Sequence, residues 1–88
     1  MLHRPAILRI GKGAIIECSK VLAIIDASKP SVPLVKYRQQ MIEVGRAVNV
    51  TKGRAVKSFV ITDTNHLFLC SVKSETLFDK FGDNDDDE

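Results

Sequence analysis

The first apolar segment of the chain, residues 6–10, is predicted to be a β-strand with Ala6, Leu8 and Ile10 on one face. Within residues 6–10, Leu8 falls on one face and Arg9 on the other. A Gly-Lys-Gly segment follows at 11–13, and glycine readily adopts the positive φ angles that tight turns require. We therefore predict a β-hairpin in which residues 14–18 return beside residues 6–10.

The apolar period changes to that of an α-helix from residue 32 onward. Ser31 suits the N-cap position, Pro33 is tolerated in a first turn, and Gly45 favours the end of a helix. We predict one amphipathic helix over residues 32–44 that packs on the sheet. Its apolar stripe contains Leu34, Tyr37, Met41 and Val44, and Ile42 widens it.

The rest of the chain predicts four more strands and a short second helix. Apolar side chains fill five consecutive positions at 21–25, which is typical of a strand covered on both faces. The segment 63–65 reads Asp-Thr-Asn and predicts a turn, because Asn accepts a left-handed backbone. The expected elements are strands at 21–26, 47–50, 56–62 and 66–72 and a helix at 73–81 with Leu77, Phe78 and Phe81 on its apolar side.

This succession of elements predicts an α+β domain with a small, mostly antiparallel β-sheet, one main amphipathic helix and a short C-terminal helix. Several strands are apolar on both faces, and two helices are too few to cover such a sheet twice. Uncovered apolar surface favours contacts between subunits, so we expect a homo-oligomer. The domain should span residues 1–82, followed by a disordered acidic tail at 83–88.

Charge is distributed unevenly along the 88 residues, which are enough for one domain. The chain carries 13 Lys and Arg against 11 Asp and Glu, and five of those acids lie in residues 83–88. The body before the tail therefore has 13 basic and 6 acidic side chains, an excess of seven positive charges. Such a body attracts phosphate polymers, anionic membrane surfaces or its own tail, although a basic surface can also serve solubility alone.

Several classes of function have no support in the sequence. The longest apolar run, at 21–25, is far too short to span a membrane, and the N-terminus does not resemble a secretory signal, so we expect a cytoplasmic protein. Catalytic and nucleotide-binding motifs are absent, so we expect no enzymatic activity, cofactor or small-molecule substrate. Cys18 and Cys70 are interpreted as small buried thiols, and His66 as a structural histidine.

The basic residues are more informative because several of them fall in predicted turns. Lys20 lies between two strands, Lys52 and Arg54 flank Gly53 at a loop tip, and Lys57 follows at the start of the next strand. Glycine lets the backbone approach a phosphate closely, and Arg presents a planar fork of donors to it. These residues could bind a nucleic-acid backbone, or they could form a solvated loop that carries charge for solubility.

Nearly the whole chain, from Leu8 to Phe81, resembles the RemA family of small bacterial regulators of extracellular-matrix (biofilm) genes and its RemB relatives. One matching segment is IGKGAII at 10–16 followed by SKVLAI at 19–24. The other is TKGRAVKSFVITDTNH at 51–66 followed by SVKSETL at 71–77. The individual motifs are short, and it is their order and spacing that carry the resemblance.

The resemblance implies a DNA-binding transcriptional regulator that assembles as a homo-oligomeric ring and engages double-stranded DNA mainly through its backbone and shape. The family's key arginine falls on Arg54, and its further basic positions fall on Lys57 and Lys20. The sequence departs from the family at Ala55, where relatives can carry a second arginine, and in its acidic tail.

Repetition of a few phosphate contacts around a ring would favour A·T-rich sites that bend easily and have a narrow minor groove. A structural or adaptor oligomer that binds protein partners without nucleic acid is the alternative, and the loss of the second arginine at Ala55 favours it.

Overall fold

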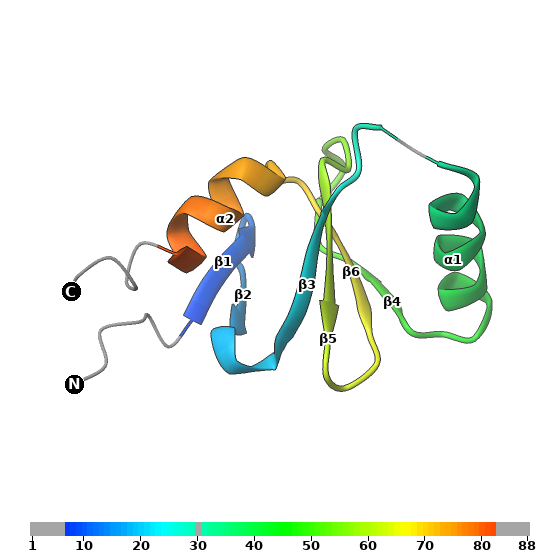
Figure 1. The fold of residues 1–88 in the computed structure, drawn as a ribbon, viewed down its shortest axis with the longest axis horizontal. Helices are drawn as coiled ribbons and strands as arrows, with labels where there is room; N and C mark the ends of the chain where they lie inside the picture. The colour runs from blue at the N-terminus through cyan, green and yellow to red at the C-terminus, as the bar shows by residue number, and fades with distance from the viewer. Residues whose placement is uncertain (1–6, 30, 83–88) are drawn as a thin grey trace.

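The computed structural model describes residues 7–29 and 31–82 and arranges them in three layers around a central β-sheet (Figure 1). The sheet has four strands in the order β3-β5-β6-β4. Pairing is antiparallel between β3 and β5 and between β5 and β6, and parallel between β4 and β6. The strands are β3 (Val21–Asp26), β4 (Ala47–Asn49), β5 (Ser58–Thr62) and β6 (Leu67–Cys70). The α+β class is confirmed, and the sheet is mixed.

The N-terminal hairpin is confirmed, but it forms a separate two-stranded sheet. Strands β1 (Ile7–Gly11) and β2 (Ala14–Glu17) pair antiparallel, and Gly13 in the turn has a φ of 77°. A short 3-10 helix, η1 (Cys18–Lys20), then leads into β3. The expectation of one sheet was therefore wrong, because the hairpin lies across the large sheet instead of continuing it (Figure 1).

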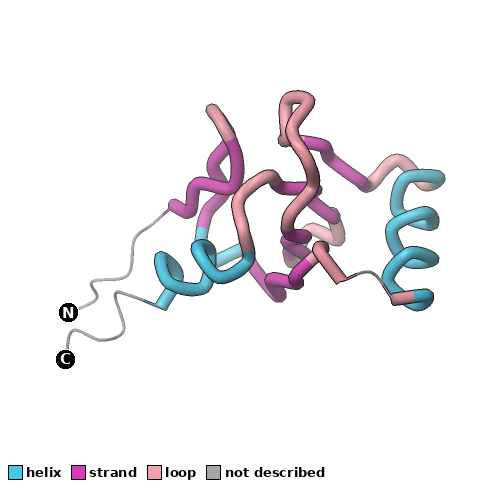
Figure 2. Tube along the Cα trace, turned by 90° about the horizontal axis from the view of Figure 1, so that it is seen from above, coloured by secondary structure: helices cyan, strands magenta, loops and turns pink. Residues whose placement is uncertain are grey.

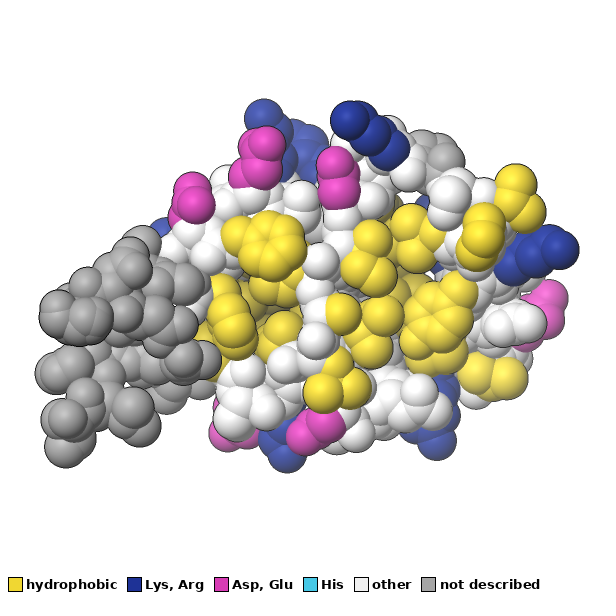
Figure 3. Space-filling model, viewed as in Figure 1, with side chains coloured by type: hydrophobic (Ala, Val, Ile, Leu, Met, Phe, Trp, Pro, Cys, Tyr) yellow, Lys and Arg dark blue, Asp and Glu magenta, His cyan; other side chains and the backbone are white. Residues whose placement is uncertain are grey.

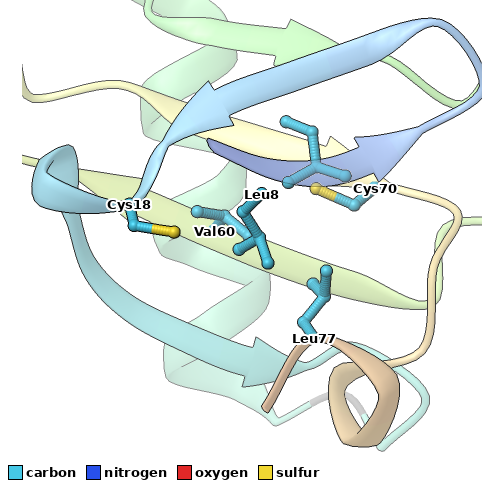
Figure 4. Close-up of a cluster of buried hydrophobic side chains, with 6 residues drawn as sticks. Leu8, Cys18, Val60, Cys70 and Leu77 are labelled. Carbon is cyan, nitrogen blue, oxygen red and sulfur yellow. The ribbon is translucent and has the colours of Figure 1, made fainter. Parts of the chain in front are cut away.

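Two hydrophobic clusters cover the two faces of the sheet. The first joins the hairpin and the C-terminal helix α2 (Ser74–Gly82) to one face (Figure 4). The second joins α1 (Val32–Glu43) to the opposite face. The first contains Leu8, Ile10, Cys18, Val60, Cys70 and Leu77, and the second contains Met41, Phe59, Leu67 and Leu69. The hairpin thus supplies the cover that two helices alone could not provide.

Helix α1 begins and ends as the sequence predicts. The Ser31 hydroxyl accepts a hydrogen bond from Leu34 N at 3.4 Å, and Gly45 follows the helix with a φ of 76°. Met41 is buried in the second cluster, whereas Ile42 and Val44 are exposed. Including these two in the core stripe was wrong, because Ile42 is rotated by about 100° from Met41 and Val44 lies beyond the last helical residue.

Helix α2 buries Leu77 completely and leaves Phe78 54% exposed. The two residues are adjacent, and adjacent helical side chains point in directions about 100° apart. Phe81 is half-buried against the first cluster. The prediction of a short amphipathic helix is confirmed, but the placement of Phe78 in its core was wrong.

Strand β3 forms one edge of the sheet, and its apolar run is not fully covered. Leu22 is 67% exposed, although Ile24 packs against the first cluster and Ile25 against the second. The expectation that residues 21–25 are covered on both faces was therefore wrong for Leu22.

The predicted turn at 63–65, which joins β5 to β6, is confirmed, with Asn65 at a φ of 65°.

Cys18 and Cys70 are both buried, as predicted. Burial raises the pKa of the Cys70 thiol to about 12. No helix among the described residues is long and apolar enough to cross a membrane. The predicted acidic tail, residues 83–88, lies outside the described residues.

Candidate nucleic-acid interface

The strand register collects several loops at one end of the sheet. Asp26 pairs with Ser58, Ser58 pairs with Cys70, and Asn49 of the parallel strand β4 pairs with Leu69. The segments that follow β3, β4 and β6 and the one that precedes β5 therefore meet along this end, at the top of Figure 1. Four of their exposed cations, with one from the β1–β2 turn, define what we call the basic edge: Lys12, Lys52, Arg54, Lys57 and Lys73. Lys29, in the segment that follows β3, is exposed as well.

The centre of the basic edge is the tight turn at residues 51–54. Arg54 N donates to Thr51 O at 3.1 Å, and Thr51 in turn donates from its N and its hydroxyl to Asn49 Oδ1 at 2.9 and 2.7 Å. Lys52 and Gly53 have positive φ angles of 54° and 86°, which is the geometry of a primed turn. Thr51 is buried, so the turn is anchored from below while Lys52, Gly53 and Arg54 are exposed.

The β1–β2 turn packs beside this loop and adds Lys12 to it. A Cβ carbon built on Gly13 would lie 3.9 Å from the Lys52 Nζ atom, so the two turns are in contact. Seen from above, the two turns project from the same side of the molecule (Figure 2). The sequence correctly predicted a hairpin turn at 11–13, but it could not show that this turn lies against Lys52. The sequence feature that could have indicated Lys12 is the pair of glycines on either side of it, because Gly53 lies beside Lys52 in the same way.

Lys57 and Lys73 extend the basic edge toward β3. The backbone of Lys57 is held on both sides, since its N donates to Cys70 O at 2.8 Å and its O accepts from Ala27 N at 3.1 Å. Lys73 follows β6 directly, and its carbonyl oxygen accepts from Leu77 N to begin α2. Both lysines line one small cleft. Lys57 was expected from the sequence, whereas Lys73 was not, because no turn motif distinguishes it.

Lys20 lies at the opposite end of the sheet. Its carbonyl oxygen accepts from Asp63 N at 2.9 Å, beside the turn that joins β5 to β6. The six-residue strand β3 separates it from the basic edge by roughly 20 Å. The structure therefore brings together four of the five residues selected from sequence, namely Lys52, Gly53, Arg54 and Lys57, and leaves Lys20 apart.

The basic edge offers positive charge, backbone N–H groups and a guanidinium fork, and this combination suits oxygen anions such as phosphates. Within the described chain, neither Lys52 nor Arg54 forms an ion pair with a carboxylate. The described residues contain no group of three His, Cys, Asp or Glu side chains arranged to hold a metal ion. His66 contacts the Thr64 hydroxyl through Nδ1 at 2.9 Å, at the end of the sheet where Lys20 lies.

Comparison with known proteins gives a consistent result over nearly the whole described chain. Residues 7–81 match the RemA-like family, described as "Extracellular matrix regulatory protein A-like". Several bacterial proteins named "Putative regulatory protein" are similar along their length. One from Nitratidesulfovibrio vulgaris (strain DP4) is 33% identical over 81 residues, covering 92% of each chain. Another, from Maridesulfovibrio salexigens, is 33% identical over 76 residues and covers 86% of each chain.

A third organism gives the same result. A protein of that name from Fervidobacterium nodosum is 33% identical over 75 residues, covering 85% of this chain and 78% of its own. The matched span contains all of the basic edge as well as Lys20.

Proposed function

The chain belongs to the RemA-like family, and on that premise we propose that it is a DNA-binding transcriptional regulator of extracellular-matrix genes. In this proposal it acts in the cytoplasm and contacts the phosphate backbone of duplex DNA through its basic edge. The regulatory name of its relatives supports the first part. The position of the cations supports the proposed contact between the basic edge and the DNA backbone.

The observation that carries the proposal is the convergence of cations from separate loops at one end of the sheet. Lys12, Lys52 and Arg54 come from two turns that are about forty residues apart in the chain yet lie in contact. Exposed like charges repel one another, so gathering them costs free energy unless an anionic partner is bound. A phosphate polymer supplies such a partner at regular intervals.

Each residue has a role that its chemistry suggests. Arg54 would form a bidentate contact with a phosphate, or enter a narrow minor groove, and Lys12, Lys52 and Lys57 would act as point charges. Gly53 would let the backbone N–H groups of the turn approach the phosphate closely. Lys20, at the opposite end, could join the same duplex only if a neighbouring subunit presents it there.

A homo-oligomeric ring would make this small interface effective, and we include it in the proposal. One subunit neutralises only a few phosphates, which gives weak binding at physiological salt, whereas repeated copies act together on one bent duplex. Exposed apolar side chains on every layer provide surface for subunit contacts, and Figure 3 shows hydrophobic side chains spread over one face of the molecule. The exposed residues are Ile7, Ile15, Leu22, Val32, Val35, Ile42, Val44, Val48 and Phe78. Shape readout would favour A·T-rich duplexes.

A fluorescence-anisotropy titration of an A·T-rich duplex, at two salt concentrations, tests the proposal. Wild type should bind, and affinity should fall steeply with salt. Arg54→Ala should weaken binding at least about tenfold, the cost of a charged hydrogen-bonded contact. The matched control is Lys36→Ala, which removes one exposed positive charge from α1, away from the basic edge. Equal affinities for the Arg54 and Lys36 variants would refute the assignment of the basic edge.

The same exposed apolar residues favour one second candidate, an adaptor oligomer that binds protein partners without nucleic acid. This adaptor would also assemble as a homo-oligomer, but it would have no affinity for the duplex even at low salt. The wild-type titration alone therefore separates the two candidates.

A further inference from the structure

A polar cleft lies at the β3 side of the basic edge, between the end of β3, the start of β5 and the start of α2. Its volume is about 330 Å³. The residues that line it are Asp26, Ser28, Lys57, Lys73, Ser74 and Glu75. None of the sequence motifs pointed to this cleft, because its walls come from three separate segments of the chain.

The N-terminus of α2 opens into the cleft. The first helical hydrogen bond runs from Leu77 N to Lys73 O at 3.1 Å, so the N–H groups of Ser74, Glu75 and Thr76 have no acceptor within the helix. Free N–H groups at a helix start, with the positive end of the helix dipole, favour an oxygen anion. Lys73 stands at the cap position, where its ammonium group adds to the same field.

Ser74 provides an independent indication that a ligand belongs here. Its side chain is only 7% exposed and lines the cleft, and among the described residues its hydroxyl has no hydrogen-bond partner. No buried side-chain oxygen of the described residues lacks a partner, so the Ser74 hydroxyl is the part of this residue that reaches the cleft, where a bound molecule or water can accept a hydrogen bond from it. A phosphate oxygen placed before the helix would accept from this hydroxyl and from the N–H groups beside it.

The charges around the cleft select among anions. Lys57 and Lys73 supply two positive charges, while Asp26 and Glu75 supply two negative ones. Hydrogen bonds from the Ser28 hydroxyl and N–H, at 2.6 and 2.8 Å, lower the pKa of Asp26, so its carboxylate stays ionised at neutral pH. In Figure 3, Asp and Glu side chains accompany Lys and Arg along this upper edge. Lys29, which also acts on Asp26, and the helix dipole then leave a small net positive field, which suits the single negative charge of a phosphodiester.

We propose that this cleft binds a single phosphodiester group of a nucleic-acid backbone, through Lys57, Lys73, the Ser74 hydroxyl and the N-terminal N–H groups of α2. The inference rests on the proposed DNA-binding function and adds a second point of contact to it. Three strand spacings separate the ends of β3 and β4, which is about 14 Å. The cleft and the Arg54 turn therefore lie within reach of one strand of a duplex, whose charges follow every 3.4 Å or so along the axis.

The test is the anisotropy titration repeated with Lys73→Ala and with Lys80→Ala as its matched control. Both remove one lysine from α2, but Lys80 lies in the last turn of the helix, away from the cleft. Lys73→Ala should weaken DNA binding about tenfold. It should also make the salt dependence of the affinity shallower, by the amount expected for about one lost phosphate contact. The affinity of Lys80→Ala should stay within about twofold of wild type. If Lys73→Ala behaves like Lys80→Ala while Arg54→Ala loses affinity, the cleft is not used and the DNA-binding proposal stands.

A second measurement keeps the inference testable if wild type does not bind the duplex. Dimethyl phosphate, a phosphodiester, and inorganic phosphate are titrated into isotopically labelled protein, and amide chemical shifts are followed by NMR. Saturable shifts at Ser74, Glu75 and Thr76 with the diester, lost in Lys73→Ala, would support the cleft and refute only the DNA proposal. No shift with the diester, or equal shifts with both probes, would overturn the inference that the cleft selects a phosphodiester.

Discussion

Gly11 lies so close to Val50 that a Cβ carbon added to Gly11 would stand 2.6 Å from the Val50 carbonyl oxygen. This contact joins the N-terminal hairpin to the segment that leads into the 51–54 turn. It explains why the hairpin turn can deliver Lys12 to the basic edge. A side chain at Gly11 would push the two segments apart, because the atom that it meets belongs to the backbone and cannot rotate away.

We therefore expect Gly11→Ala to destabilise the fold by about 1–3 kcal/mol, measured by urea unfolding, and to weaken DNA binding as Lys12 moves away. Gly45→Ala is the control, since its Cβ would also meet nothing within 4 Å, only the strain of a positive φ is added, and it lies outside the basic edge. A Gly11 variant with an unchanged unfolding midpoint would contradict the close packing of the hairpin against Val50.

Asp26→Asn should strengthen DNA binding. The substitution removes a negative charge from the polar cleft but keeps a side-chain oxygen that can accept the hydrogen bonds of Ser28. We expect roughly a two- to fivefold gain in affinity at low salt, and a smaller gain at high salt. Because the pKa of Asp26 is lowered, the gain should persist down to mildly acidic pH. Weaker binding by Asp26→Asn would contradict the repulsion between this carboxylate and the bound phosphate.

Deletion of residues 83–88 should also tighten DNA binding, because it removes five acidic side chains from a body with an excess of seven positive charges. The gain should shrink as salt is raised. A tail of equal length with Asn and Gln in place of Asp and Glu separates charge from length. If only the deletion tightens binding, the tail acts by occupying space and not by its charge.

The buried Cys70 thiol predicts a loss of stability at alkaline pH. The unfolded thiol ionises near its ordinary pKa of 9.0, whereas the folded one stays protonated up to about pH 12. Stability should therefore fall as pH rises between these values, by about 1.4 kcal/mol at pH 10. Urea unfolding at pH 8 and 10 measures the loss, and Cys70→Ala should lack this part of it. Identical pH dependence in the two proteins would contradict the assignment to Cys70.

Leu22 on the edge strand β3 tests the proposed assembly. At 67% exposure it contributes little to the isolated fold, so Leu22→Asp should change the unfolding free energy by no more than about 0.5 kcal/mol. If a neighbouring subunit covers β3, the same substitution should lower the molar mass measured by light scattering. Leu22→Ala serves as the milder comparison. An unchanged mass for Leu22→Asp would exclude β3 from the subunit contacts.

Residues close together in the chain specified the local elements and the buried sides of most of them. Alternation predicted the hairpin, the helical period with Ser31 and Gly45 predicted α1 within one residue, and Asn65 marked the β5–β6 turn. These features depend on residues that are near neighbours in the chain, and periodicity records such relationships directly.

Which loops meet depends on contacts between distant parts of the chain. The parallel pairing of β4 with β6, together with the packing of the hairpin over the sheet, brought Lys12 and Lys73 to Arg54 and sent Lys20 to the far end. It also left Phe78 and Leu22 exposed. Periodicity shows which face of a strand is buried, but not which strand lies beside it. That choice depends on how the whole chain covers its apolar surface, so it is made only when the chain folds.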